Sequence, residues 1–362
     1  MTNLKQNLNL KKYNSYRVEA FAKHFIEINN EKDLEELKNI SDFKSLRKMV
    51  LGDGSNTLFV NDYDGLIIKN DLKGKEIVKE TDEYILVKIN SGENWHEFVT
   101  WAVESNYAGV ENMALIPGSI GAAPAQNIAA YGQNQSDIFV ELTAFNLETF
   151  EYEVFNSDKC DFKYRSSVFK NEFRDKYFIT DVTYKLSKYT KELETSYHER
   201  KRRYGSLQDA LEAVGKEPFG IDDIYNAVIY MRKRRLPDPD KVGTVGSFFI
   251  NPIVSKEKFE ELSKMVSELQ HYPFDKLMYT EKEWDVIKDD YVKVPAARFI
   301  DERGWKDRWI NNVASSPSHG LCIISNWRAS GQDILDYANL VKKDIFDTYG
   351  IELESEVNII QK

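Results

Sequence analysis

Two glycine-rich stretches of this chain combine small side chains with almost no charge. The longer one, residues 115–132, reads LIPGSIGAAPAQNIAAYG, and the shorter one, residues 51–59, reads LGDGSNTLF. Small residues let the backbone approach a ligand closely, and glycine adopts a positive φ without steric cost. Successive backbone N–H groups in such turns form a concavity that binds an anion, usually a phosphate. Either stretch alone is also typical of a tight turn in a core, but two of them indicate a large cofactor with a diphosphate.

Several common catalytic and binding motifs are absent from the sequence. There is no GxxxxGK[ST] phosphate loop, no CxxC, no HExxH and no GxSxG. The five histidines are scattered and the two cysteines, Cys160 and Cys322, are far apart, so no metal site is predicted. The GDGSN turn does not match the GxGxxG fingerprint, and a Rossmann domain is therefore not predicted.

The elements that hold the glycine-rich stretches can be predicted from periodicity. Alternation predicts strands on both sides of the GDGSN turn, at 85–89, and in a later group near 138–146, 150–156 and 177–186. The apolar residues of 95–103 share one helical face, and Asn94 with Glu97 resembles a capping box. A short helix capped by Asn30 is also predicted before the GDGSN turn.

The second half of the chain is predicted to be α+β as well. Residues 222–235 form a helix that the Leu-Pro-Asp-Pro sequence stops. The last helix begins near Ser330 and ends at Gly350, which is a natural residue for a left-handed helix end. Residues 351–360, IELESEVNII, are predicted to form one terminal strand.

The composition describes a folded, acidic protein. A length of 362 residues implies roughly two or three domains, and the 13% aromatic content argues against disorder. The formal net charge of −10 argues against nucleic acid as a partner, so local cationic clusters must hold any anionic ligand. Two cysteines suit a reducing cytoplasm. No apolar run approaches a membrane span and no signal peptide is recognisable, so a cytoplasmic protein without membrane insertion is predicted.

Taken together, the motifs resemble those of the UDP-N-acetylenolpyruvoylglucosamine reductases, the flavoenzymes of peptidoglycan precursor synthesis. GDGSN, IPGSIGAAPAQNIAAYG, YRSSVFK and GSFFINP match the family's motifs, and the resemblance extends from about residue 14 to residue 360. A charged insertion at 188–220, with Tyr204-Gly205-Ser206-Leu207, resembles the subgroup that keeps a tyrosine-bearing loop. The resemblance implies an α+β fold of three domains with FAD binding of the vanillyl-alcohol oxidase type. It also implies NADPH as hydride donor, UDP-N-acetyl-enolpyruvylglucosamine as the small-molecule substrate, and a monomer.

The implied reaction adds hydride to an enol ether of pyruvate, so the enzyme must stabilise an enolate and deliver one proton. Arg165 would grip the substrate carboxylate with two parallel hydrogen bonds, although the Tyr-Arg pair alone is more typical of a surface arginine. Glu356 would be protonated and donate a second hydrogen bond to the enolate. On pattern alone, the terminal strand places three glutamates on one face, which is typical of a solvated surface. Ser247 would protonate the enolate carbon, although GSFF is otherwise typical of a turn into a strand.

The resemblance also assigns binding residues. FAD, bound without a covalent link, would contact Gly52, Asp53, Gly54, Ser55, Asn56, Pro117, Gly118, Ser119, Gly121, Ala122, Asn127 and Ile128. The UDP-sugar would contact Tyr131, Tyr204, Arg232, Arg235, Asn251, Lys293 and His319. The basic end of helix 222–235 would equally complement the helix dipole, and a lone histidine such as His319 is more often structural. Two departures stand out: Arg235 replaces the lysine of better-known members, and Ala129 replaces a usual glycine.

The predicted domains are an FAD-binding subdomain at 1–70, a second FAD-binding subdomain at 71–235 with the insertion 188–220, a substrate-binding domain at 236–350, and a returning strand at 351–362. One alternative is a sugar or lactone oxidase of the same flavin fold. Such oxidases often tether flavin through His or Cys, and neither glycine-rich stretch contains either residue. The other alternative is a non-catalytic UDP-sugar or flavin-binding module, against which Arg165, Ser247 and Glu356 together argue.

Overall fold

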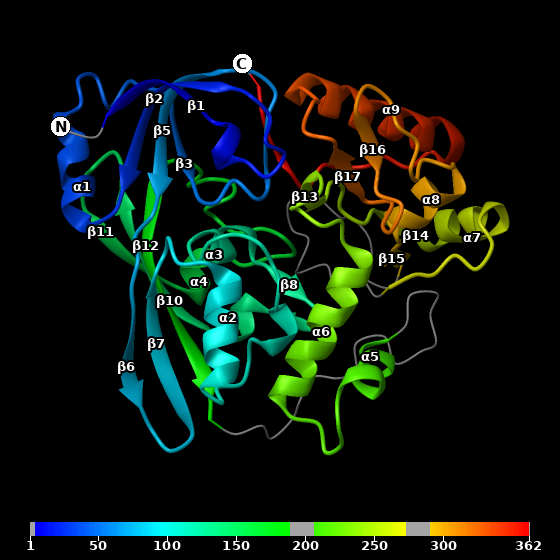
Figure 1. Ribbon diagram of the computed structural model, residues 1–362, viewed down its shortest axis with the longest axis horizontal. Coiled ribbons are helices and arrows are strands. Elements are labelled where there is room, and N and C mark those ends of the chain that lie inside the picture. The colour runs from blue at the N-terminus through cyan, green and yellow to red at the C-terminus, as the bar shows by residue number, and fades with distance from the viewer. Residues whose placement is uncertain (1–3, 189–205, 273–289, 362) are drawn as a thin grey trace. The chain divides into compact units, whose positions relative to one another are not determined.

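The computed structural model describes residues 4–188, 206–272 and 290–361 (Figure 1). The chain divides into two compact units. Unit 1 comprises residues 1–7, 23–53 and 65–234, and unit 2 comprises residues 8–22, 54–64 and 235–362. Helices and strands occur in both, as expected for the predicted α+β class. Tyr204, together with residues 189–205 of the predicted insertion, lies outside the described residues.

Unit 1 is built on a five-stranded antiparallel sheet in the order β11-β10-β12-β7-β6. The central strand β12 (Tyr177–Ser187) is mostly buried and pairs with a neighbour on each side. The other strands are β6 (Lys75–Glu80), β7 (Tyr84–Asn90), β10 (Phe139–Asn146) and β11 (Tyr152–Asn156). The strands predicted near 138–146, 150–156, 177–186 and at 85–89 are therefore confirmed.

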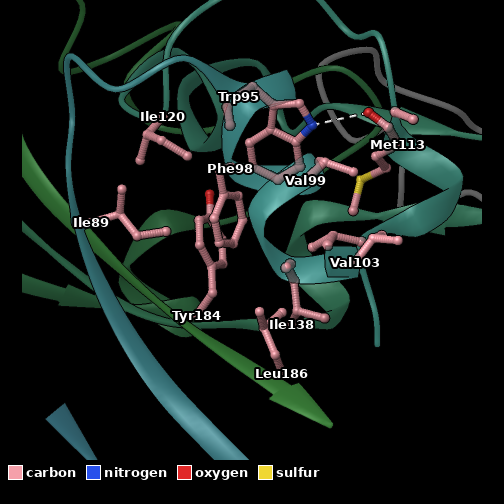
Figure 2. Packing of buried hydrophobic residues seen from close by; sticks show 14 of the residues in the cluster. Ile89, Trp95, Phe98, Val99, Val103, Met113, Ile120, Ile138, Tyr184 and Leu186 are labelled. Carbon is pink, nitrogen blue, oxygen red and sulfur yellow. Dashed lines mark hydrogen bonds between the residues drawn. The ribbon is translucent and has the colours of Figure 1, made fainter. Parts of the chain in front are cut away.

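Helix α2 (Trp95–Glu104) packs its apolar stripe against this sheet. The Trp95 indole meets the Tyr184 ring edge-on at 5.7 Å, and its Nε1–H donates to the Met113 carbonyl at 3.1 Å, as Figure 2 shows. Phe98 stacks on Tyr184 at 5.7 Å. The Asn94 side chain accepts the Glu97 N–H, which confirms the predicted helix start. Aromatic pairs of this kind stabilise a core beyond their buried area, so α2 gives the loops at its N-terminal end a rigid base.

A four-stranded sheet in the order β1-β2-β5-β3 flanks the GDGSN turn, because β3 comes before the turn in the chain and β5 comes after it. Its strands are β1 (Lys5–Asn9), β2 (Phe21–Ile28), β3 (Lys48–Leu51) and β5 (Tyr63–Asn70), and β3 and β5 pair in parallel. The turn follows β3, and β4 (Thr57–Phe59) follows the turn, as predicted. The predicted Asn30 cap is confirmed, because Asn30 forms a complete capping box with Asp33 at the start of α1 (Glu31–Glu35).

Three short helices and one longer helix complete the described part of unit 1. They are α3 (Ala122–Gln126), α4 (Ser157–Cys160), α5 (Leu207–Val214) and α6 (Ile221–Arg235), with the two-residue strands β8 (Ala129–Ala130) and β9 (Gln133–Asn134) between α3 and β10. The helix predicted at 222–235 corresponds to α6, which buries Ile224, Val228 and Met231 on one face. Its apolar residues belong to the same core cluster as α2 and the sheet.

The described residues of unit 2 contain smaller sheets and three helices longer than one turn. Its strands are β13 (Gly243–Ser247), β14 (Ile253–Ser255), β15 (Tyr291–Lys293), β16 (Val313–Ser315), β17 (Cys322–Ser325) and β18 (Asn358–Ile360), and its helices are α7 (Lys256–Met265), α8 (Ala296–Glu302) and α9 (Gly331–Tyr349). Strands β13, β17 and β16 form one sheet, β14 pairs with β15, and β18 pairs in parallel with β4. Helix α9 begins after the Ser330 cap and ends at left-handed Gly350, as predicted. No helix in the described ranges is long and apolar enough to cross a membrane.

The prediction of one continuous terminal strand over 351–360 is wrong. Only Asn358–Ile360 forms a strand, and before it a single bridge joins Ser355 to Phe249. The segment changes partner along its length: its Glu356 N–H donates to the Phe248 carbonyl, whereas its Asn358 N–H donates to the Asn56 carbonyl. Two successive partners do not make one ladder, so one continuous strand over 351–360 does not form.

Candidate functional site

The two glycine-rich stretches meet within unit 1. A β-carbon built on Gly52 would lie 2.7 Å from Ser119 Oγ and 3.9 Å from the Ala122 β-carbon. Ser119 is only 2% exposed, so it has little room to withdraw. A β-carbon on Gly121 would likewise lie 2.8 Å from the Ser91 β-carbon. Close packing therefore favours glycine at both positions, at Gly52 against the other glycine-rich stretch and at Gly121 against Ser91.

The loop leaves two successive backbone donors available. Among the described residues, no group accepts a hydrogen bond from the Gly118 or Ser119 N–H. The next two residues are anchored, because Ile120 N–H donates to the Glu93 carbonyl and Gly121 N–H donates to the Ser91 carbonyl, each at 2.8 Å. Gly118 has a φ of 120°, which a side chain would disfavour. Adjacent unsatisfied N–H groups on a fixed backbone suit the diphosphate of a dinucleotide.

A second loop carries Arg165 to the first. Lys163 and Ser166 exchange backbone hydrogen bonds of 3.0 and 3.2 Å across a tight turn, and Arg165 occupies that turn at a φ of 57°. The Asn127 carboxamide donates from Nδ2 to the Lys163 carbonyl at 2.9 Å. Arg165 Nη2 donates to the Ala129 carbonyl at 3.0 Å. The predicted cofactor residue Asn127 and the predicted catalytic residue Arg165 therefore lie in one hydrogen-bonded group.

Several residues of this region have a left-handed backbone. Leu115, Asn127, Tyr131 and Arg165 all have φ values between 43° and 57°, in the left-handed region that side chains disfavour. Each such residue costs about 1–3 kcal/mol and persists only where its surroundings hold it. Strain of this kind is typical of ligand-binding and catalytic sites, so the four residues support the placement of the site here.

Buried polar residues that the sequence analysis missed hold the strained backbone. The Asn112 Nδ2 group donates to the Tyr131 carbonyl at 2.7 Å, and Asn112 is fully buried. The Gln133 Oε1 atom accepts the Asn112 N–H at 3.3 Å, and Gln133 Nε2 donates to Glu111 Oε1 at 3.3 Å. Gln135 Nε2 donates to Asn127 Oδ1 at 3.1 Å. The signal was the Glu-Asn pair within the largely apolar residues 108–116, which composition alone did not connect to the loop.

Unit 2 brings Ser247 and Glu356 onto neighbouring segments. Ser247 ends β13 and pairs with Cys322, while the next residue, Phe248, donates its N–H to the Leu321 carbonyl at 2.8 Å. The Phe248 carbonyl in turn accepts the Glu356 N–H at 2.8 Å. Gly246, beside Ser247, has a φ of 77°, and a β-carbon there would meet nothing within 4 Å. Among the described residues, open space therefore lies beside the Gly246 α-carbon, one position before Ser247.

The GDGSN turn also reaches this part of unit 2. Gly54 has a φ of 66°, and a β-carbon there would lie 2.0 Å from the Tyr13 carbonyl oxygen, so another residue would not fit. Asn56 Nδ2 donates to the Glu356 carbonyl at 3.2 Å. A predicted cofactor residue therefore helps to position the backbone of a predicted catalytic residue.

The predicted substrate residues of unit 2 have defined structural contacts. Burial lowers the pKa of His319 to about 4; Asp301 opposes this shift, while Lys306 and Arg235 add to it. The neutral His319 ring accepts the Leu321 N–H at Nδ1, at 3.3 Å. Asn251 Oδ1 accepts the N–H of Ala296 at 3.0 Å, at the start of α8.

Two predicted substrate residues lie on other elements. Lys293 lies on β15 opposite Ile253. Arg232 lies on α6 in unit 1, where its charge lowers the pKa of His96.

The close packing of Gly52 yields a stability prediction. Gly52→Ala should lower the free energy of unfolding by about 1–3 kcal/mol, because its β-carbon overlaps Ser119 Oγ. In Gly52→Ala/Ser119→Ala the nearest atom is the residue-119 β-carbon at 3.8 Å, so the double variant should lose less than the sum of the two single losses. Denaturant unfolding measures all three. Gly220→Ala is the matched control, because its nearest neighbour would be Asp223 Oδ2 at 3.9 Å. Additive losses in the double variant would contradict the contact.

Two protein-family models and one solved structure match this chain. The family described as "FAD binding domain" matches residues 22–148, and the family described as "UDP-N-acetylenolpyruvoylglucosamine reductase, C-terminal domain" matches residues 238–360. The solved structure of UDP-N-acetylenolpyruvylglucosamine reductase from Thermus caldophilus superposes with a TM-score of 0.62 at 18% identity, and the match covers 98% of each chain. These matches confirm the predicted α+β fold with an FAD-binding part and a C-terminal domain.

Curated relatives match over the full length. The chain is 40% identical over 358 residues to the UDP-N-acetylenolpyruvoylglucosamine reductase of Flavobacterium johnsoniae, covering 99% of both chains. It is 34% identical over 358 residues to the protein of the same name from Amoebophilus asiaticus, again covering 99% of both. The resemblance seen in the motifs is confirmed by these matches: the chain belongs to the UDP-N-acetylenolpyruvoylglucosamine reductase family.

Proposed function

We propose that this chain uses NADPH and FAD to reduce the enolpyruvyl ether of UDP-N-acetylglucosamine to UDP-N-acetylmuramate in peptidoglycan precursor synthesis. The observation that carries the proposal is the 40% identity, over 99% of both chains, to a relative named as the reductase. The FAD binding domain matched at residues 22–148 identifies the cofactor. The two alternatives, an oxidase of the same fold and a non-catalytic module, lose support because the full-length relatives are named as reductases.

The described contacts suit FAD in the proposed residues of the two glycine-rich stretches. The available N–H groups of Gly118 and Ser119 would hold the diphosphate, since charged oxygens accept strongly from backbone donors. Gly52 and Gly121 would let the backbone approach, because a β-carbon at either would overlap a neighbouring serine. The remaining proposed contacts are Asp53, Gly54, Ser55, Asn56, Pro117, Ala122, Asn127 and Ile128.

The chemistry that bound FAD supplies is transfer of hydride from NADPH to the terminal carbon of the enolpyruvyl double bond. The side chains must then stabilise negative charge on the substrate carboxylate and protonate the carbon to which that carboxylate is attached. Arg165 is a permanently charged donor that can make two parallel bonds to a carboxylate. Glu356 would be the second side chain that stabilises the same enolate. Ser247 Oγ would hold the proton that completes the addition.

The UDP portion requires cations in a chain of net charge −10. Arg232 and Arg235, at the end of α6, would provide them. Arg235 lies close enough to His319 to lower the pKa of that ring, which supports its place among the proposed substrate residues. The other proposed contacts are Tyr131, Tyr204, Asn251, Lys293 and His319.

The domain boundaries proposed from the sequence, 1–70, 71–235, 236–350 and 351–362, stay a proposal. The start of the C-terminal family match at residue 238 supports the boundary between 235 and 236, whereas the match at 22–148 spans the proposed boundary between 70 and 71. A monomer stays a proposal that rests on the family resemblance. A cytoplasmic location is proposed because Cys160 and Cys322 are both buried and neither forms a disulfide.

Acid precipitation of the purified protein tests the cofactor. A yellow supernatant that contains FAD is expected, because the proposed site has no His or Cys tether in either glycine-rich stretch. Absorption spectra and chromatography of the supernatant measure it. Flavin that remains on the pellet, or FMN in the supernatant, would contradict noncovalent FAD.

Ser247→Ala should block proton delivery and leave flavin reduction intact. Loss of a positioned general acid typically costs on the order of 10²–10⁴ in rate. The variant should keep its fold, because β13 and the Phe248 contacts are made by backbone groups. Stopped-flow absorbance should show normal bleaching by NADPH and slow reoxidation by the enolpyruvyl UDP-sugar. Equal slowing of both half-reactions would count against the assignment of Ser247 as the acid.

Arg235→Ala should raise KM more than it lowers kcat, because contacts to UDP persist along the whole reaction path. Arg165→Ala should lower kcat by about 10²–10³, because the charge it stabilises develops in the transition state. Glu356→Gln should act in the same direction but more mildly, since an amide still donates one hydrogen bond. Arg234→Ala is the matched control, because Arg234 lies one position away and bonds to Tyr230. Steady-state kinetics separate these effects, and an unchanged KM with a collapsed kcat in Arg235→Ala would reverse the division of roles.

A further inference from the structure

His96 is a half-buried histidine on α2 that neither the motifs nor the proposed reaction uses. Its Nδ1 atom accepts the Leu115 N–H at 3.2 Å. Leu115 is the first residue of the 115–132 stretch and has a φ of 56°. A leucine in this region of backbone conformation is strained and must be held from outside. The histidine therefore contacts the flavin-binding loop at the point where its strained backbone begins.

Helix α6 fixes the imidazole ring from the other side. The Tyr225 ring stacks on His96, with ring centroids 6.0 Å apart and planes 24° apart. The Thr100 hydroxyl donates to the His96 carbonyl at 2.9 Å and also shares a hydrogen bond of 2.8 Å with the Tyr225 hydroxyl. The ring thus has a fixed orientation in which Nδ1 faces the loop.

The charges around His96 favour the form that can accept. Burial lowers the pKa of His96, and the positive charge of Arg232 and then that of Lys233 lower it further, while Glu97 opposes them. Arg232, Lys233 and Tyr225 belong to α6, Glu97 belongs to α2, and the loop presents the Leu115 N–H. At neutral pH the ring is neutral, and Nδ1 keeps the lone pair that the Leu115 N–H needs.

We propose that His96 is a positioning residue for FAD, whose Nδ1 acceptor holds Leu115 and thereby fixes the backbone from which Pro117, Gly118 and Ser119 extend. This role rests on the proposed function, because those three residues are FAD contacts only if the loop binds the cofactor. His96 itself acts through Leu115. Its loss should be visible as weaker retention of FAD by the holoenzyme, independent of turnover.

Three variants separate the acceptor from the ring. His96→Phe keeps an aromatic ring for Tyr225 but has no acceptor, and it should release FAD about tenfold faster than wild type. His96→Asn places an oxygen close to the position of Nδ1 and should restore most of the retention. Tyr225→Phe is the control: it keeps the stacked ring, loses only the bond to Thr100, and should release FAD at the wild-type rate. Flavin fluorescence after dilution of the holoenzyme measures release, and thermal unfolding checks that each variant is folded.

The pH dependence of FAD release is a further test, because a residue with a merely structural role would not affect it. Because the pKa of His96 is lowered from its ordinary value of about 6.5, the bond to Leu115 is intact above that pH. It is lost as the pH falls through the lowered pKa, when Nδ1 gains a proton. FAD release from wild type should therefore accelerate as the pH falls below about 6.5, and release from His96→Asn should lack this component.

The outcomes separate this proposal from the proposed function. If purified wild type contains no FAD, the proposed function fails. If wild type contains FAD but His96→Phe releases it at the wild-type rate, the role of His96 alone is overturned. Equal, fast release from His96→Phe and His96→Asn would also overturn it, because the acceptor would then not matter.

Discussion

The hydrogen bonds of the Asn127 carboxamide are the constraint on which the rest of the unit 1 site depends. Its Nδ2 donates to the Lys163 carbonyl, and its Oδ1 accepts from Gln135, so both ends of a buried amide are satisfied. An amide held at both ends has one orientation, and an alternative would leave buried polar groups unpaired. The left-handed Asn127 backbone is the C-cap of α3, and its N–H donates to the carbonyls of that helix. The turn that carries Arg165 is then fixed relative to the glycine-rich loop.

Packing of the core beneath the site offsets the backbone strain of this arrangement. Four left-handed residues cost about 1–3 kcal/mol each, and the site cannot exist unless a rigid support offsets that cost. Trp95, Phe98 and Tyr184 form that support where α2 meets the central strand, each 2% exposed or less. Trp95 also forms a direct hydrogen bond to the segment before the loop, because its indole N–H donates to the Met113 carbonyl. Packing and strain are therefore linked. The packed core stabilises the strained loop conformation, and that conformation exposes the N–H groups of the loop.

Sequence patterns predicted what depends on neighbours in the chain and failed where partners are distant. The start of α9 at Ser330 and its end at Gly350 follow from local capping, and both were predictable. The segment before β18 alternates as a strand would, yet it exchanges one partner for another, which no pattern along the chain reveals. His96 was missed because its role lies in a bond to Leu115, nineteen residues away. The left-handed backbone of Leu115 and Arg165 has no signal in their side chains, since only surrounding structure imposes it.

Unit 2 positions its reactive side chains by a different means. Phe248 uses both of its backbone groups, donating to the Leu321 carbonyl and accepting from the Glu356 N–H. Asn56 adds a bond to the Glu356 carbonyl. Ser247 and Glu356 are therefore located by main-chain bonds that do not depend on their own side chains. A substitution at either changes chemistry with little change in position, whereas a substitution at Asn127 would change position first. Kinetic effects at Ser247 and Glu356 can accordingly be interpreted as chemistry, and effects at Asn127 or His96 as preorganisation of the loop.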